Sequence, residues 1–246
     1  MSEIQSLARG LKILEMLAAA DEVGITEVAE QLDIDKASAS RLMQTLANYG
    51  YAEKDRDTQR FRLGAKIVEL SQSLLSRMPF RDEAKPYLRK LVEATNECAH
   101  LAIYAQGQVL YIDQVESMAT LRVNAAIGNL APLHCTALGK VLLAFGDAPI
   151  PKDLSAHTPR TITDHEMLTM HLTRVSRDGY AIDDEEFDVG VRCIAAPVYD
   201  VTGKMVGAMG ISGPSNRMGL EKIQQIAVKV TTITQELTDH LCFKRT

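Results

Sequence analysis

Residues 25–62 constrain the fold more than any other stretch of this chain, because they predict a short helix, a tight turn, a second helix and a polar hairpin. Thr26 is a candidate N-cap for the first helix, since its hydroxyl can accept one of the unpaired first-turn amides. The turn ends at Asp35, a candidate cap for a second helix over 36–48. This order predicts a winged helix-turn-helix, a unit whose second helix fits the DNA major groove.

The second helix of this motif has one apolar and one polar face. Ala39, Leu42 and Leu46 fall at i, i+3 and i+7, which turns them toward a core. Arg and Gln form paired hydrogen bonds to guanine and adenine edges, and small Ala and Ser side chains let the backbone approach DNA closely. Arginines of the wing, Arg62 among them, would reach phosphates or the minor groove. The predicted DNA-contacting residues are Lys36, Ala37, Ser38, Ser40, Arg41, Gln44, Arg56 and Arg60.

The charge distribution favours DNA as the partner of this segment. Residues 1–35 hold two Lys and Arg residues against eight Asp and Glu residues, a net charge of −6. Residues 36–62 hold six against three, a net charge of +3. Phosphate neutralisation needs local positive charge, so the overall charge of −5 is no objection. The alternative is a helical hairpin that contacts another protein, because small polar residues on an exposed helix face are often only solvated.

Length and composition predict a two-domain globular protein in the cytoplasm. The chain has 246 residues, of which 46% are apolar, enough for two domains that each bury a core. No apolar run approaches the ~18–20 residues of a membrane span, and the first residues lack the pattern of a signal peptide. The cysteines show no short paired spacing, so they indicate neither a disulfide framework nor a zinc site, and we expect no cofactor. They are Cys98, Cys135, Cys193 and Cys242.

Two further helical patterns flank the motif. Before it, four leucines recur at helical spacing from Leu7 to Leu17 and predict a first helix that closes the small domain. After the wing, apolar residues from Leu63 to Leu74 recur at i, i+4, i+7 and i+11. That stripe is as narrow as the seam between two paired helices. We interpret it as a linker helix that ends before Pro79, since a residue preceding proline resists the helical conformation.

The rest of the chain alternates between predicted helices and strands. Helices are predicted over 80–97, 136–145, 164–178 and 220–241, and strands over 99–104, 109–113, 120–125, 193–199 and 205–212. Antiparallel strands flanked by helices indicate a layered α+β domain. The predicted organisation is a winged helix-turn-helix domain over 1–62, a linker helix over 63–79 and a second domain over 80–246.

Five segments carry a resemblance to a known family. They are SLARGLKILEML, KASASRLMQTLANYGY, LHCTALGKVLLA, RDGYAIDDEEFDVGVRCIAAPVYD and GAMGISGP. In order and spacing the chain resembles the isocitrate lyase regulator (IclR) family of bacterial transcription regulators along nearly its whole length. The resemblance implies an N-terminal winged helix and a C-terminal GAF-like effector-binding domain. It also implies a DNA-binding regulator and not an enzyme, in which dimers, often paired into tetramers, act on palindromic operator DNA.

A helix start in the second domain is a candidate anion site. The segment from Pro132 to Thr136 leads into a predicted helix, so the first-turn amides lie at the positive end of the dipole without intrahelical acceptors. The resemblance implies that a small organic acid, a carboxylate effector, binds beside this turn. It implies a pocket lined by the backbone of Ala137 and Leu138 and by the side chains of Asp183, Cys193 and Ser212.

The chain departs from the family pattern at this turn. Family members often have Ser-Gly-Ala where this chain has Thr136-Ala137-Leu138. The bulkier side chains favour an effector larger than a two-carbon acid, with keto acids, hydroxy acids and aromatic carboxylates all open. Neither the operator sequence nor the choice between repression and activation follows from these residues.

Two other classes of protein remain as alternatives. A metal or redox sensor would use His134, Cys135, Asp183 and Cys193, which are zinc-ligand types without a characteristic spacing. Cys135 near a helix N-terminus would then have a lowered pKa. A thiol-dependent enzyme on the GAF-like domain would need a base beside its nucleophile, and no motif points to such a pair. His134 also suits a packing role, and Asp183 also suits a solvated turn.

Overall fold

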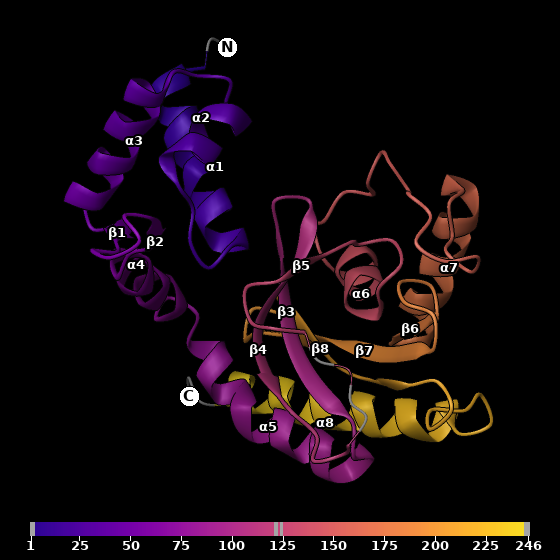
Figure 1. Ribbon diagram of the computed structural model, residues 1–246. Coiled ribbons are helices and arrows are strands. Elements are labelled where there is room, and N and C mark those ends of the chain that lie inside the picture. The colour runs from indigo at the N-terminus through magenta and orange to yellow at the C-terminus, as the bar shows by residue number, and fades with distance from the viewer. Residues whose placement is uncertain (1–2, 121–122, 124, 244–246) are drawn as a thin grey trace. The chain divides into compact units, whose positions relative to one another are not determined.

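The computed structural model describes residues 3–120, 123 and 125–243, and the chain divides into two compact units, residues 1–78 and 79–246 (Figure 1). Each unit has its own buried core. Among the described residues, no helix combines the length and the apolar character needed to cross a bilayer.

The first unit is a cluster of three helices with a two-stranded wing, followed by a fourth helix. The strands are antiparallel, with Ala52 opposite Leu63, and Val23 forms a bridge to Phe61 that ties the wing to the helices. The core comprises Ile13, Leu17, Val28, Ala39 and Met43 with neighbouring apolar residues. The elements are α1 (Gln5–Ala19), α2 (Ile25–Gln31), α3 (Lys36–Asn48), β1 (Ala52–Lys54), β2 (Phe61–Leu63) and α4 (Lys66–Leu75).

The starts of α2 and α3 show one wrong prediction and one correct one. Asp35 caps α3, because its carboxylate accepts the Ser38 amide at 2.8 Å. Thr26 is not the cap of α2. That helix begins earlier, at Ile25, with Gly24 as its extended N-cap, and the Glu27 carboxylate accepts the Gly24 amide at 3.2 Å.

The apolar stripes of α1 and α4 differ from the prediction in what they bury. The buried residues of α1 are Ile13 and Leu17, whereas Leu7 and Leu11 lie on its exposed side. The ten-residue α4 is shorter than the predicted linker helix and has no buried residue. The predicted linker helix is too long at both ends, because Leu63 belongs to β2 and Pro79 already begins the next helix.

The second unit is built on a six-stranded antiparallel sheet in the order β5-β4-β3-β8-β7-β6. Its strands are β3 (Cys98–Ala105), β4 (Gln108–Val115), β5 (Leu130–Ala131), β6 (Ala181–Asp184), β7 (Val191–Tyr199) and β8 (Met205–Pro214). Its helices are α5 (Pro79–Thr95), α6 (Ala137–Phe145), α7 (His165–Asp178) and α8 (Ile223–Phe243).

Helices cover both faces of this sheet. The helices α5 and α8 lie side by side on one face, and α6 lies on the other with α7 packed against it (Figure 1). Beneath α6, a core forms around Val109, Leu133, Val141 and Ala195. The arrangement confirms the predicted α+β class, and it places the N-terminus of α6 over the middle of the sheet.

Most predicted elements of this unit are present, and three differ. The predicted strand over 120–125 is partly outside the described residues, and Thr120, Val123 and Ala125 belong to no strand. The strands β5 and β6 have no predicted counterpart. Both are short, and β6 ends on two aspartates, so neither shows the apolar alternation that predicts a strand.

Candidate functional site

The predicted DNA-contacting residues of α3 lie together on the face turned away from the core. Ala39 and Met43 are buried on the opposite side. Arg41 Nη2 donates to Ser38 Oγ at 3.2 Å, which holds the guanidinium along the helix. Of the six residues, Lys36, Ala37, Arg41 and Gln44 are exposed, and Ser38 and Ser40 are half-buried.

The tip of the wing presents one arginine freely. Asp55 orders the turn, because its carboxylate accepts the amides of Asp57 at 2.9 Å and Thr58 at 2.8 Å. These hydrogen bonds lower the pKa of Asp55, so the carboxylate stays charged. Arg56 is exposed in this turn, and within the described residues it forms no ion pair.

Two other arginines of the wing are already paired. Arg60 Nη2 donates to the Glu27 carboxylate at 2.8 Å and to the Glu22 carbonyl at 3.1 Å. Arg62 lies 3.3 Å from the Glu53 carboxylate. To contact a phosphate, either side chain must exchange its carboxylate partner for DNA.

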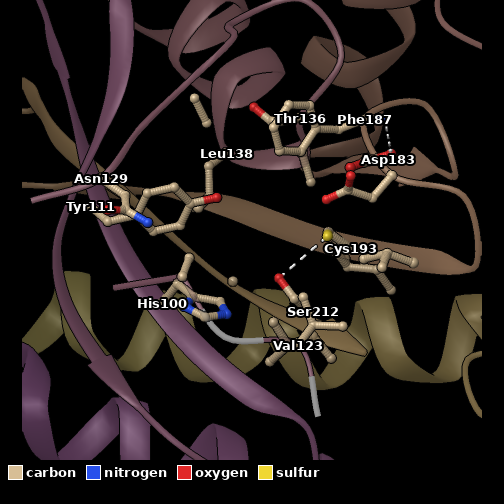
Figure 2. A pocket seen from close by; sticks show the side chains of 18 of the residues that line it. His100, Tyr111, Val123, Asn129, Thr136, Leu138, Asp183, Phe187, Cys193 and Ser212 are labelled. Atoms are coloured by element: carbon tan, nitrogen blue, oxygen red, sulfur yellow. Dashed lines mark hydrogen bonds between the residues drawn. The ribbon is translucent and has the colours of Figure 1, made fainter. Parts of the chain in front are cut away.

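The second unit contains a cavity of about 190 Å³ between the sheet and the start of α6 (Figure 2). Pockets for drug-sized ligands span ~300–1,000 Å³, so this one suits a compact molecule. All five residues predicted for the effector site line it: Ala137, Leu138, Asp183, Cys193 and Ser212.

Three of these residues form one row across three strands. Asp183 on β6 is the direct partner of Cys193 on β7, and Cys193 is the direct partner of Ser212 on β8. The Cys193 thiol donates to Ser212 Oγ at 3.3 Å. Figure 2 shows the three side chains directed into the same cavity. The sheet register therefore gathers residues that lie far apart in the sequence.

The first turn of α6 presents two amides that have no acceptor within the helix. The Thr136 hydroxyl caps the helix by accepting the Gly139 amide at 3.1 Å, and it donates to the Pro132 carbonyl at 2.7 Å. The amides of Ala137 and Leu138 precede the first intrahelical donor and have no acceptor within the helix. Gly139 permits this packing, since a Cβ there would lie 2.3 Å from the Leu133 carbonyl oxygen.

Burial controls ionisation in the cavity. Asp183 is 1% exposed. Desolvation raises its pKa to about 7, although the Glu186 amide donates to the carboxylate at 2.8 Å. Burial also raises the pKa of Cys193 well above its ordinary value, so that side chain is a neutral thiol. Near neutral pH the Asp183 carboxyl group therefore exchanges between a hydrogen-bond donor and an acceptor.

His100, which no sequence motif indicates as a site residue, also lines the cavity. It is buried on β3, and in the part of the chain that the structure describes neither ring nitrogen has a hydrogen-bond partner. Desolvation lowers its pKa to about 4, so the imidazole is neutral. Its ring lies edge-on to Tyr111, with ring centroids 5.6 Å apart. The one available signal was a histidine within the apolar strand sequence CAHLAIYA.

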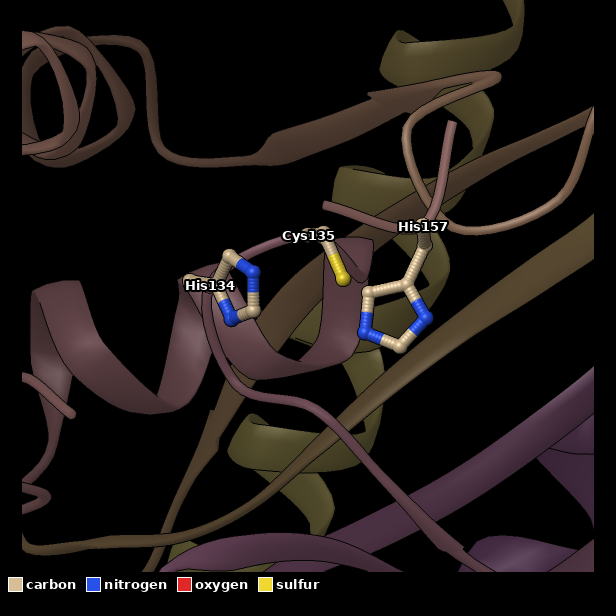
Figure 3. A group of neighbouring side chains, drawn as sticks. All are labelled: His134, Cys135 and His157. Carbon is tan, nitrogen blue, oxygen red and sulfur yellow. The ribbon is translucent and has the colours of Figure 1, made fainter. Parts of the chain in front are cut away.

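The residues of the metal-sensor alternative are divided between two places. Asp183 and Cys193 line the cavity, whereas His134 and Cys135 lie beside His157 (Figure 3). The expected lowering of the Cys135 pKa is wrong. Desolvation raises the pKa of this thiol to about 12, because burial outweighs the nearby helix terminus. The raised pKa also removes the activated nucleophile that a thiol-dependent enzyme would need.

The chain matches two family models. Residues 6–56 match the IclR helix-turn-helix domain, and residues 72–239 match the C-terminal domain of the bacterial transcriptional regulator IclR. These two matches span both units of the structure.

Characterised proteins and a solved structure agree with the models. The HTH-type transcriptional regulator BhcR of Paracoccus denitrificans is 33% identical over 96% of this chain and 86% of its own length. The regulator KdgR of Escherichia coli is 32% identical over 96% of this chain and 92% of its own length. The crystal structure of the Thermotoga maritima IclR covers 98% of this chain and all of its own, with a TM-score of 0.78 and 27% identity. The chain therefore belongs to the IclR family of bacterial DNA-binding transcriptional regulators, and not to a family of enzymes.

Proposed function

We propose that this regulator binds operator DNA through α3 and the wing, and that a small organic acid in the cavity controls this binding. The observation that carries the proposal is the convergence of the first-turn amides of α6, which lack intrahelical acceptors, with the row formed by Asp183, Cys193 and Ser212. One cavity then offers donors for an anion and hydrogen-bonding groups for the rest of the ligand.

The chemistry of the cavity favours a hydroxy or keto acid. A carboxylate would accept the amides of Ala137 and Leu138 at the positive end of the helix dipole. A hydroxyl or carbonyl on the same ligand would face Asp183, whose raised pKa lets it accept or donate near neutral pH. The unpartnered nitrogens of His100 favour a further polar group at the far side.

The effector class is tested by thermal-shift measurements on the full-length protein with a panel of keto, hydroxy and aromatic acids. A ligand present at a hundred times its Kd stabilises the native state by ~2.7 kcal/mol. We expect a dose-dependent shift from one class, reduced in Asp183→Asn and retained in the control Asp239→Asn on the exposed side of α8. If no acid shifts the transition, or if Asp183→Asn responds like the wild type, the proposed site is wrong.

The family assignment gives the DNA partner, and we propose the residues that contact it. Arg41 and Gln44 lie on the exposed face of α3, where they would read base edges, and Arg56 would contact the backbone. DNA fragments selected from a random pool by the full-length protein would identify the operator. A two-fold symmetric consensus is expected, and an asymmetric single site would contradict binding by a symmetric dimer.

We further propose that the protein forms a homodimer, and that two dimers pair into a tetramer as the family resemblance implies. Leu70 and Leu74 of α4 are 46% and 51% exposed, a narrow apolar stripe of the kind that pairs helices. In this proposal residues 63–79 act as the linker between a DNA-binding segment over 1–62 and an effector-binding segment over 80–246. Effector binding would favour one dimer arrangement and so set the separation of the recognition helices, roughly 34–36 Å for adjacent major grooves. A coupling free energy of ~1–3 kcal/mol suffices for such control.

A further inference from the structure

Three metal-ligating side chains meet outside the lining of the cavity. His134 and Cys135 precede α6, and His157 lies in the loop between α6 and α7. One potential ligand atom from each residue lies within 4.8 Å of the other two (Figure 3). The proposed binding of DNA and of an organic acid uses none of these three groups.

His134 is held in one orientation by the backbone. The residue is buried, and its Nε2 lies 3.0 Å from the Ser155 carbonyl oxygen. A carbonyl oxygen only accepts, so Nε2 carries the hydrogen and the other ring nitrogen keeps its lone pair. A hydrogen bond from the second ring nitrogen to a backbone carbonyl is the usual support for a metal-ligating histidine.

His157 belongs to an ordered loop with an exposed side. Its amide donates to Thr161 Oγ1 at 3.0 Å, and that hydroxyl donates to the Glu186 carbonyl at 2.6 Å. The neighbouring Thr158 hydroxyl donates to the Glu185 carbonyl at 2.7 Å. The backbone beneath the ring is therefore anchored, while the exposed side chain leaves an entry path for an ion.

Cys135 provides the thiol, with its side chain fully buried. A thiol in this setting keeps its proton unless a cation replaces it, and metal binding is the reaction that makes the exchange favourable. The positive charge of Lys140 lies near Cys135 and would repel a bound cation. Its ion pair with Glu186, which is buried, offsets that charge.

We propose that His134, Cys135 and His157 form a zinc site, with the fourth position open to water or a further ligand. Thiolate and imidazole ligands select zinc over magnesium or calcium. Tetrahedral zinc with Zn–S of about 2.3 Å and Zn–N of about 2.0 Å needs ligand atoms roughly 3.3–3.6 Å apart. The ligand atoms lie within 4.8 Å of one another, so zinc binding requires them to move closer, and the exposed His157 side chain can rotate to do so.

The test measures zinc binding to the full-length protein, purified without a histidine tag and stripped with a chelator. Zinc is titrated in competition with a chromophoric chelator, and cobalt is used as a spectroscopic substitute. We expect one zinc per chain, and a cobalt spectrum with tetrahedral bands and a thiolate charge-transfer band.

The matched variants decide whether these residues are the ligands. His157→Ala removes an exposed ligand and is compared with His165→Ala, an exposed histidine outside the cluster. We expect His157→Ala to weaken zinc binding by at least ~100-fold, since loss of an outer-shell partner alone costs ~10–100-fold. Cys135→Ser should remove the charge-transfer band, and Cys242→Ser should keep it. Equal zinc affinity in His157→Ala and His165→Ala, or only weak binding without fixed stoichiometry, would overturn the proposal.

Discussion

Asp183 on β6 and Cys193 on β7 are direct cross-strand partners, and both side chains face the same cavity. Burial raises the pKa of each group and so disfavours its ionised form. The pair therefore brings two proton-bearing groups to one wall of the pocket. Its consequences can be measured in the absence of any ligand.

Asp183 makes the stability of the protein depend on pH. Its pKa is about 7 in the folded protein against 3.8 for an ordinary aspartate, so the native state binds more protons between these values. Stability therefore falls as pH rises from about 4 to 7, and levels off above that range. Urea unfolding at pH 5 and pH 8 should show a loss of a few kcal/mol from this group. The loss should be absent in Asp183→Asn, and the same pH dependence in both proteins would contradict the assignment.

Arg41→Ala should weaken specific operator binding by ~1–3 kcal/mol, because the variant loses the guanidinium that we propose contacts a base. The control Arg174→Ala removes an exposed arginine of α7 in the other unit. Fluorescence anisotropy with selected operator DNA checks the difference between the two. Equal affinities for both variants would mean that Arg41 does not lie on the face of α3 that contacts DNA bases.

The wing arginines should differ in their response to salt. Arg56→Ala should reduce the slope of log K against log salt by about 1, as expected for one lost phosphate contact. Arg60→Ala should reduce it by less, because Glu27 already balances the Arg60 charge. If Arg60→Ala reduces the salt-dependence slope as much as Arg56→Ala does, Arg60 exchanges Glu27 for a phosphate when the protein binds DNA.

His100→Phe tests whether the unpartnered imidazole recognises the effector. The free protein should lose no stability, because the replacement removes buried polar atoms that form no hydrogen bond. Effector affinity should fall about tenfold, the equivalent of one lost hydrogen bond of ~1.4 kcal/mol. Calorimetry on His100→Phe and on the exposed control His165→Phe separates the two effects. Unchanged affinity would exclude His100 from ligand contact.

Leu70→Glu should disrupt the proposed dimer, because it places charge in the middle of the exposed stripe of α4. Met167→Glu on α7 is the control, since Met167 is exposed and apolar but lies in the other unit. Sedimentation equilibrium gives the mass of each variant. A Leu70→Glu protein with the same mass as the wild type would show that α4 does not pair.

The features that the sequence predicted well depend on neighbouring residues. The limits of α3 follow from Asp35 as a cap and from helical spacing within the segment itself. The family motifs likewise named five residues that one cavity gathers. Thr26 is an exception, because neighbouring residues compete to cap a helix. In α2 the N-cap is Gly24, whose amide donates to the Glu27 carboxylate.

The features that were missed depend on distant parts of the chain. His100 is notable because β4 and β8 flank it on β3 and, among the described residues, its ring nitrogens have no partner, which no local sequence pattern indicates. The predicted lowering of the Cys135 pKa is wrong because a helix terminus is visible in the sequence, whereas full burial is not. His157 joins His134 and Cys135 through the path of a loop.

The absence of any buried residue in α4 has a consequence for the helix itself. A ten-residue helix with so little buried surface is marginal in water, where lengths below ~12–15 residues rarely persist. If pairing with a second copy supplies the missing packing, folding of this segment and assembly become one equilibrium. Dilution would then melt α4 as it separates the subunits, and circular dichroism would record the dissociation as lost helix content.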